Sequence, residues 1–137
     1  MIEKFVIENW ALIAVAFASG AMLIWPLVSG ARDGARLSTL QATQLINQRD
    51  ALVIDIRDQA DFARGHIFNA KNFPDKVFDE RKTELEKFKE QPVIVSCDTG
   101  MRAGSSATKL RTMGFKEVFT LQGGLQAWRD AGLPVTK

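Results

Sequence analysis

The hydrophobic and polar positions divide the chain into two regimes. Residues 10–28 are almost all apolar, whereas from residue 37 onward short β-branched runs alternate with stretches whose apolar residues recur at helical spacing. The predicted strands cover residues 52–54, 71–73, 92–96 and 117–121. One predicted helix begins at the possible caps Ser38 and Thr39, and three more cover residues 59–64, 78–89 and 105–113. A last predicted helix follows Gly123 and Gly124. Strands that alternate with helices predict an α/β fold whose central sheet is mainly parallel and flanked by helices.

The apolar run at residues 10–28 is expected to form one N-terminal transmembrane helix. As a helix it would be about 28 Å long, close to the hydrocarbon thickness of a bilayer. Trp10 and Trp25 lie near its ends, where indole rings favour the headgroup region. A cleaved signal peptide is the alternative, because small residues follow at 29–31, although acidic residues near the start disfavour it. We therefore predict a transmembrane anchor at 1–31, a linker at 32–36 and a globular domain at 37–137.

Basic residues beside the apolar run predict its orientation. Arg32 and Arg36 follow the run, and only Lys4 precedes it. Basic residues concentrate on the cytoplasmic side of membrane helices. A reducing compartment also suits a chain whose single cysteine has no partner for an internal disulfide. The predicted location is a single-pass position in the lipid bilayer, with the C-terminal domain in the cytoplasm.

Composition excludes several classes of protein. Of the 137 residues, 46% are hydrophobic and 25% are charged, as in globular proteins and unlike disordered ones. The formal net charge of +2 is small and dispersed, which argues against binding to nucleic acid. A single cysteine excludes a disulfide framework and any multi-cysteine metal site. We expect no metal and no other cofactor.

Cys97 is the main candidate for chemistry. It directly follows the predicted strand 92–96, and a short loop separates it from a predicted helix. Ligands bind beyond the carboxyl ends of parallel strands, and loop N–H groups together with a helix dipole favour a thiolate over a thiol. Gly100 permits a tight turn, and Arg102 adds a positive charge, with hydroxyl groups on Thr99, Ser105 and Ser106. These neighbours favour a nucleophile over the alternative of an inert core residue.

Three segments resemble the rhodanese family and occur in the family's order. They are ALVIDIRDQADFARGHIFNAKNFP at 51–74, PVIVSCDTGMRAGSSA at 92–107 and GFKEVFTLQGGLQAW at 114–128. The resemblance extends from about Leu37 to Pro134, which is nearly the whole predicted domain. Several coordinated segments are a more specific signal than a Cys-x-x-Gly pattern alone. The arrangement is similar to that of the small membrane-anchored members of the family.

The resemblance implies a rhodanese-type sulfurtransferase. Cys97 would accept a sulfane sulfur from a donor such as thiosulfate or a protein persulfide, and the cysteine persulfide would pass it to a thiol or cyanide acceptor. The acceptor thiol is expected on a small molecule or on a partner protein. The family pattern implies that loop N–H groups stabilise the persulfide and that an arginine side chain holds an anionic donor. The loop residues are Asp98, Thr99, Gly100, Met101 and Arg102, and the arginine is Arg102.

The length of this loop disfavours a related activity. Phosphatases that resemble this family have five residues between the cysteine and the arginine. Here only four residues, at 98–101, separate Cys97 from Arg102. A smaller ring suits a sulfur atom better than a tetrahedral phosphate, so phosphatase activity is not expected.

Asp98 departs from the family pattern, because many active members have a basic or neutral residue after the cysteine. Its charge would oppose both a thiolate and an anionic donor. This favours a persulfide carried by another protein over thiosulfate. The same charge supports an alternative function, a catalytically weak or inactive module that recruits a partner to the membrane. A redox sensor is disfavoured, since the chain has no second cysteine to resolve a sulfenic acid.

Four other residues are interpreted as scaffold. His66 matches a Gly-His-Ile signature that is structural in the family it resembles, and a preformed thiolate needs no general base. Asp55 and Arg57 follow a predicted strand and are expected to brace the region around the cysteine. Trp128 is expected to pack in the core.

Overall fold

The computed structural model describes residues 1–29 and 36–137. The chain forms two compact units, at residues 1–33 and 34–137, and each is described by itself. Of the predicted linker at 32–36, only Arg36 lies within the described residues, and the predicted end of the anchor at 30–31 lies outside them. The predicted boundary between anchor and domain therefore stays a prediction.

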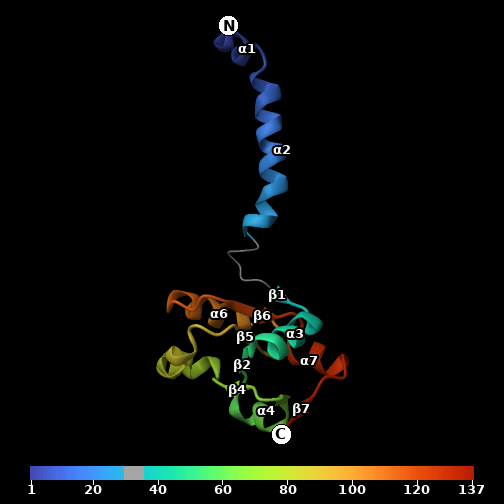
Figure 1. The fold of residues 1–137 in the computed structure, drawn as a ribbon, viewed down its shortest axis with the longest axis vertical. Helices are drawn as coiled ribbons and strands as arrows, with labels where there is room; N and C mark the ends of the chain where they lie inside the picture. Colours follow the sequence, from blue (N-terminus) through green and yellow to red (C-terminus); the bar gives the residue numbers. More distant parts are fainter. Residues whose placement is uncertain (30–35) are drawn as a thin grey trace. The chain divides into compact units, whose positions relative to one another are not determined.

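Two helices form the N-terminal unit, α1 at Ile2–Glu8 and α2 at Trp10–Ser29 (Figure 1). Asn9 ends α1, since its side-chain amide donates to the carbonyl oxygen of Phe5 at 2.9 Å. Among the described residues, no single helix is both long and apolar enough to cross a bilayer. Only α1 taken together with Trp10–Ile24 meets both criteria, across a bend of 77°. The predicted single transmembrane helix is therefore not confirmed.

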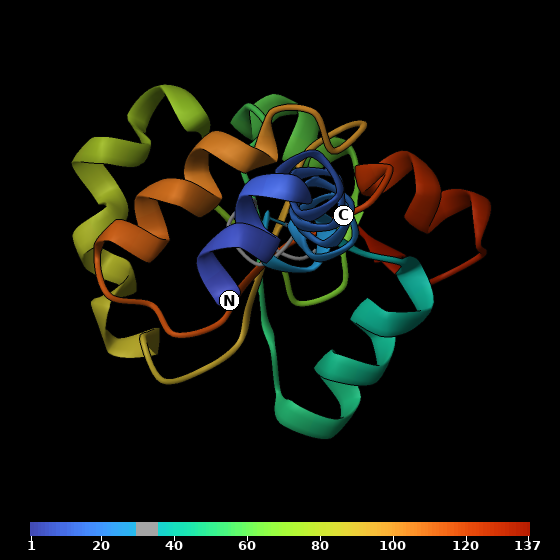
Figure 2. The same cartoon turned by 90° about the horizontal axis from the view of Figure 1, so that it is seen from above.

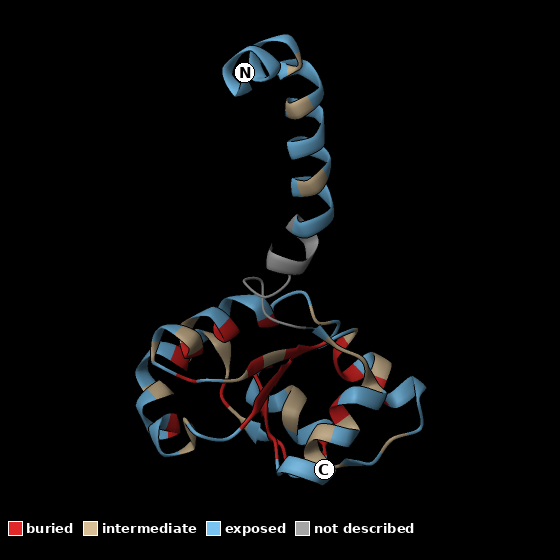
Figure 3. Cartoon of the chain, turned by 45° about the horizontal axis from the view of Figure 1, so that its top comes forward, coloured by how far each residue is buried: buried red, intermediate tan, exposed pale blue. Residues whose placement is uncertain are grey.

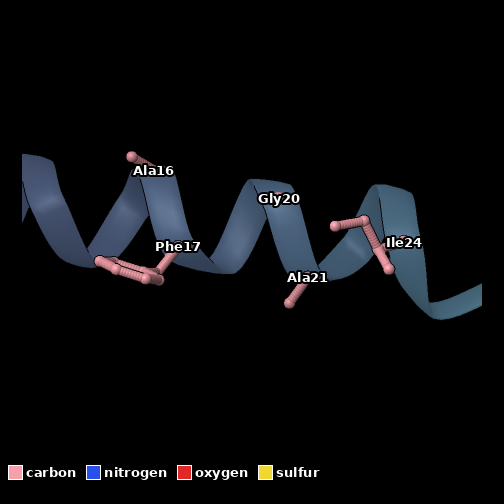
Figure 4. Close-up of a pocket in the computed structure, with 5 residues that line it drawn as sticks. All are labelled: Ala16, Phe17, Gly20, Ala21 and Ile24. Carbon is pink, nitrogen blue, oxygen red and sulfur yellow. The ribbon is translucent and has the colours of Figure 1, made fainter.

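The surface of α2 has a shallow hollow beside Gly20 (Figure 4). Among the described residues, nothing outside the adjoining backbone of α2 lies within 4 Å of the position that a side chain at Gly20 would take. The residues around the hollow are Ala16, Phe17, Ala21 and Ile24. The larger side chains of Phe17 and Ile24 flank a stretch of small ones, which leaves this face of the helix indented.

The C-terminal unit is built on a five-stranded parallel sheet in the order β1-β6-β5-β2-β4 (Figure 1). The strands are β1 at Arg36–Leu37, β2 at Leu52–Asp55, β4 at Lys71–Asn72, β5 at Val93–Ser96 and β6 at Val118–Leu121. Every residue of the central strands β2 and β5 is buried, as expected of strands covered on both faces. The predicted α/β fold with a mainly parallel sheet is confirmed.

Helices cover both faces of this sheet (Figure 2). They are α3 at Thr39–Arg49, α4 at Gln59–Arg64, α5 at Phe78–Arg81, α6 at Ala103–Thr112 and α7 at Gly124–Asp130. Neighbouring strand residues point to opposite faces, so Ile94 belongs to the cluster of buried side chains with Trp128, and Val95 to the one with Leu110. Figure 3 shows the buried residues concentrated along the strands and on the inner sides of the helices.

The capping signal before α3 is confirmed in detail. The Ser38 hydroxyl accepts from the backbone N–H of Gln41 at 3.2 Å, and the Gln41 side chain accepts from the backbone N–H of Ser38 at 3.0 Å. These two bonds form a capping box, which satisfies two donors that the start of a helix leaves free.

The prediction of one continuous helix at 78–89 is wrong. The segment forms a 3₁₀ turn, η1 at Asp75–Val77, then α5, then a second 3₁₀ helix, η2 at Lys82–Phe88. A 3₁₀ helix repeats every three residues, so Leu85 and Phe88 lie on the same side and pack in one core cluster. A spacing of three residues fits both helix types, so the sequence did not distinguish them.

A second, two-stranded sheet was not predicted from the sequence. It pairs β3 at His66–Ile67 with β7 at Val135–Thr136 in an antiparallel arrangement. Two-residue strands are too short to show a period of two in the sequence. The ring of His66 stacks on Phe62 with 3.7 Å between ring centroids, and its Nδ1 lies 2.8 Å from the Phe62 carbonyl oxygen.

Candidate functional site

Cys97 lies at the point where β5 ends and a loop leads into α6. Its side chain is almost completely buried, with 1% of the residue surface exposed. The backbone N–H of Gly100 donates to its Sγ at 2.9 Å. A backbone donor this close stabilises negative charge on sulfur, and α6 begins directly after the loop with the positive end of its dipole. The residues therefore form a cradle for an anionic sulfur, built from backbone groups.

The start of α7 fixes the backbone of this loop. The N–H of Leu125 donates to the carbonyl oxygen of Cys97 at 2.9 Å, and the N–H of Gln126 donates to the carbonyl oxygen of Asp98 at 3.1 Å. The first N–H groups of a helix have no partner inside the helix, so they are free to make such bonds. The loop carbonyls thus cap α7, and α7 in return holds the first two residues of the loop in place.

Two glycines allow the loop and the start of α7 to approach so closely. A side chain at Gly124 would overlap the carbonyl oxygen of Cys97 and would lie 2.8 Å from the carbonyl carbon and oxygen of Asp98. At Gly100, where φ is +86°, a side chain would lie 2.9 Å from the carbonyl oxygen of Leu121. From the sequence, Gly123 and Gly124 were expected only to precede a helix. A glycine pair after the strand that neighbours β5 was the available signal for this backbone contact.

A buried ion pair lies behind the loop. The Nε of Arg57 donates to both carboxylate oxygens of Asp55 at 3.0 and 3.1 Å, and a second guanidinium nitrogen donates at 2.8 Å. The guanidinium of Arg57 also donates to the carbonyl oxygen of Gly65 at 2.6 Å. Both charged side chains are about 5% exposed, which leaves them little solvent to compensate for a lost partner. This arrangement agrees with the interpretation of Asp55 and Arg57 as a brace.

Asp98 connects this brace to the outer side of the loop. Its carboxylate lies 3.7 Å from Nε of Arg57 and 3.7 Å from a guanidinium nitrogen of Arg102. Arg102 also donates to Asp75 at 3.2 Å. Asp98 is therefore not an isolated negative charge next to the cysteine, because two guanidinium groups lie beside it.

The remaining loop side chains face outward. Thr99 is exposed, Met101 is 89% exposed and Arg102 is about half exposed. Beside Arg102 lies a hollow of about 340 Å³, whose lining residues are Asp75, Lys76, Ser105, Ser106 and Lys109. Lys109 donates to Asp79 at 3.1 Å, and this hydrogen bond holds the pKa of that carboxyl below its usual value. The loop thus has a fixed inner side and an accessible outer side.

The other sequence candidates lie in scaffold positions. Trp128 is buried, and its indole N–H donates to the carbonyl oxygen of Pro134 at 2.9 Å. His66 lies in β3 and is bound to Phe62, outside the set of residues that surrounds Cys97. Within residues 1–29 and 36–137, no three metal-ligating side chains gather closely enough to hold a metal ion.

Comparisons with known proteins agree with this geometry. The family model of the rhodanese-like domain matches residues 38–131. The chain is 40% identical over 98 residues to the uncharacterized protein YibN of Escherichia coli K12, which covers 71% of this chain and 68% of YibN. It is 36% identical over 94 residues to the thiosulfate sulfurtransferase GlpE of Coxiella burnetii, which covers 69% of this chain and 86% of GlpE.

Solved structures show the same fold. A rhodanese-related protein from Thermoplasma volcanium superposes with a TM-score of 0.66 at 25% identity, over 74% of this chain and 96% of that one. A thiosulfate sulfurtransferase from Pseudomonas aeruginosa gives a TM-score of 0.66 at 26% identity, over 75% of this chain but only 20% of the longer enzyme. With the family model matching more than half of its length, this chain belongs to the rhodanese-like domain family.

Proposed function

We propose that this protein is a sulfurtransferase that carries sulfur as a persulfide on Cys97. The observation that carries the proposal is the buried Sγ held at 2.9 Å from the N–H of Gly100 in a loop at the end of a parallel strand. Relatives named thiosulfate sulfurtransferase support the reaction class. The backbone bonds from α7 support it further, because they preorganise the loop around the sulfur.

The reaction has two steps that balance in atoms and charge. In the first, the Cys97 thiolate attacks the outer sulfur of thiosulfate, the sulfur–sulfur bond of the donor breaks, and sulfite leaves with the bonding electron pair. The product is a Cys97 persulfide that carries one negative charge. In the second, cyanide or a thiolate attacks the terminal sulfur, and the Cys97 thiolate leaves. With cyanide the product is thiocyanate, and no external oxidant or reductant is needed.

The residues around Cys97 have distinct roles in this scheme. The N–H of Gly100 stabilises negative charge on sulfur before and after the transfer. Arg102, at the outer end of the loop, attracts an anionic donor, and its contact with Asp75 keeps the guanidinium beside the loop. The scheme assigns no general base, since the attacking group is the thiolate form of Cys97.

Intact-mass spectrometry of the full-length chain tests the proposal. After incubation with thiosulfate or a small persulfide, the mass should rise by about 32 Da, and the added sulfur should be lost on reduction. Cys97→Ser, which removes the sulfur nucleophile and keeps a similar shape, should gain no sulfur. An equal gain in Cys97→Ser, or no gain with either donor, would contradict the proposal.

A catalytically weak module that recruits a partner to the membrane is the second candidate, because Asp98 places a negative charge beside the cysteine. The Gly100 N–H beside Sγ and the hydrogen bonds from α7 to the loop weaken this candidate, because they hold the loop in a form suited to an anionic sulfur. The rate at which iodoacetamide alkylates Cys97 near neutral pH distinguishes the two. Fast alkylation supports an enzyme, whereas a slowly alkylated thiol that takes up no sulfur supports the recruiting module.

We further propose that the N-terminal unit anchors the protein in a lipid bilayer, with the C-terminal domain in the cytoplasm. The support is the absence of charge from α2 and the exposure of large apolar side chains on it, such as Leu12, Phe17 and Leu23. Extraction of cell membranes with alkaline carbonate tests the anchor, because an integral protein should stay in the pellet. Protease added outside intact cells should leave the C-terminal domain uncut. Release by carbonate, or cleavage from outside, would reject the corresponding part of the proposal.

A further inference from the structure

Asp98 occupies the boundary between a buried ion pair and the solvent. Its side chain is 57% exposed, whereas that of Arg57, 3.7 Å away, is 5% exposed. The other oxygen of the same carboxylate lies 3.7 Å from Arg102, whose side chain is 47% exposed. Any donor that approaches Cys97 along the outer side of the loop therefore passes a carboxylate that two guanidinium groups already face.

The two guanidinium groups that face Asp98 each have another carboxylate partner. Arg57 is paired with Asp55, and Arg102 is paired with Asp75, so each guanidinium has a carboxylate partner before Asp98 is considered. Asp98 adds a third carboxylate to the two guanidinium groups. A small anion cannot obtain a full positive charge from either arginine unless it displaces one of these carboxylates.

Two lysines are the remaining cations beside Arg102. Lys109 donates to Asp79, and its charge is thereby shared. Lys76 is exposed at the rim of the hollow, where its ammonium group is hydrated and contributes little to binding. Arg36 lines a separate hollow with Thr99, Gly100 and Met101. On the side of the loop that faces Arg57 and Arg102, Asp98 is therefore the carboxylate that shares both guanidinium groups with another carboxylate.

We propose that Asp98 is a charge filter, which selects singly charged sulfur donors over the dianion thiosulfate. This inference rests on the proposed function, because it concerns which donor delivers sulfur to Cys97. It applies to a donor class defined by charge, such as an ionised persulfide or a thiosulfonate. Sulfur transfer from benzenethiosulfonate balances as it does from thiosulfate: the thiolate takes the outer sulfur, and benzenesulfinate leaves in place of sulfite.

The size of the filter follows from the charge of the incoming molecule. A unit charge that acts through water across roughly 7 Å changes a rate constant by a factor of about 3. For a dianion the same charge counts twice, so the factor is about 7. Replacing Asp98 by asparagine should therefore favour the approach of thiosulfate more than that of benzenethiosulfonate, and should not change the approach of a neutral reagent.

Alkylation of Cys97 by iodoacetate and iodoacetamide tests the filter without any sulfur transfer. The two reagents are nearly the same size, but only iodoacetate is charged, and the ratio of their rate constants cancels any change in the fraction of thiolate. In Asp98→Asn the ratio of iodoacetate to iodoacetamide should rise by about 3-fold, and the rise should shrink near 1 M salt. Asp98→Glu keeps the charge and should keep the wild-type ratio. Glu90→Gln removes an exposed carboxylate that precedes β5, at the opposite end of that strand from Cys97, and should also keep the ratio.

Sulfur loading then completes the test. In Asp98→Asn, kcat/KM for thiosulfate should rise by about 7-fold and for benzenethiosulfonate by about 3-fold. An unchanged alkylation ratio, or the same change in Asp98→Asn and Asp98→Glu, would overturn the filter, because charge would then not be the cause. A shifted alkylation ratio without sulfur uptake in any variant would support the filter's electrostatics and reject the proposed function, so the two failures are distinguishable.

Discussion

The inner and outer sides of the cysteine loop are held by different parts of the chain. On the inner side, backbone N–H groups of α7 bind the carbonyls of Cys97 and Asp98, and Gly124 leaves no room for a side chain. On the outer side, Asp98 and Met101 are mostly exposed, and their side chains meet solvent. The position of the nucleophile thus depends on main-chain contacts that tolerate no added atoms. The choice of donor depends on side chains that can be replaced without disturbing the fold.

The largest loss of stability is expected from breaking the buried ion pair between Asp55 and Arg57, which lies behind the loop and beside Asp98. Arg57→Met leaves the buried Asp55 carboxylate without its guanidinium partner and with only the backbone N–H of residue 57, and should lower the free energy of unfolding by about 3 to 5 kcal/mol. Arg49→Met is the matched control, because Arg49 pairs with Glu117 at the surface, where solvent screens the pair, and the loss of stability should be much smaller. Urea unfolding of the full-length chain in mild detergent, followed by circular dichroism, measures both. Equal losses in the two variants would show that burial does not set the strength of the pair.

The next largest effect tests the backbone contact on the inner side. Gly124→Ala should destabilise the domain by more than about 1 kcal/mol, because the new side chain overlaps the loop carbonyls and φ is +57°. It should also slow alkylation of Cys97 by displacing the loop. Gly104→Ala is the control: this glycine lies in α6 with open space around it, so alanine should be neutral or stabilising by up to about 1 kcal/mol. If Gly124→Ala behaved like Gly104→Ala, the contact would not hold the loop.

Changes on the outer side should leave stability nearly unchanged. Met101→Ala removes an 89% exposed side chain and should alter the free energy of unfolding by no more than about 0.5 kcal/mol. Persulfide loading by a small donor should also be retained, because the backbone cradle is intact. The same unfolding and mass measurements apply. A loss comparable to that in Gly124→Ala would contradict the distinction between the two sides.

The smallest change in stability is expected at the surface ion pair between Arg49 and Glu117. Arg49 donates to both oxygens of Glu117 and holds the pKa of that carboxyl below its usual value. A lowered pKa in the folded state adds stability above the unfolded pKa, and that stability is lost as pH falls through the folded pKa. Arg49→Gln should therefore raise the Glu117 pKa in an NMR titration, and its small loss of stability at neutral pH should vanish in acid. An unchanged pKa would show that the pair does not form in solution.

The elements that could be predicted from the sequence are those with a local pattern of residue types. The β-branched runs at Leu52–Asp55 and Val93–Ser96 are buried on both faces, and such runs are recognisable without a structure. The cap at Ser38 was likewise visible, since capping is a local interaction. The position of Cys97 followed from the strand before it and the glycine and arginine after it.

Other features were not predictable, because they depend on segments that are distant in sequence. The contact of Gly124 with the cysteine loop requires β6 to lie beside β5, and nothing in the local sequence gives that pairing. Of the two guanidinium groups beside Asp98, that of Arg102 belongs to the same loop, but that of Arg57 comes from a distant segment, so the contact with Arg57 was not visible in the sequence. The split of residues 78–88 into an α-helix and a 3₁₀ helix was not predicted, because a spacing of three residues between apolar side chains fits both helix types.

The most direct test of the central claim is to load Cys97 with sulfur and then discharge it to cyanide in a single turnover. We expect the full-length chain to gain about 32 Da from thiosulfate or benzenethiosulfonate, and to return to its original mass as thiocyanate forms in equal amount. The same cycle in Cys97→Ser should give neither the gain nor the product. A sulfur adduct that cyanide cannot remove, or thiocyanate formed equally by Cys97→Ser, would show that Cys97 does not transfer sulfur.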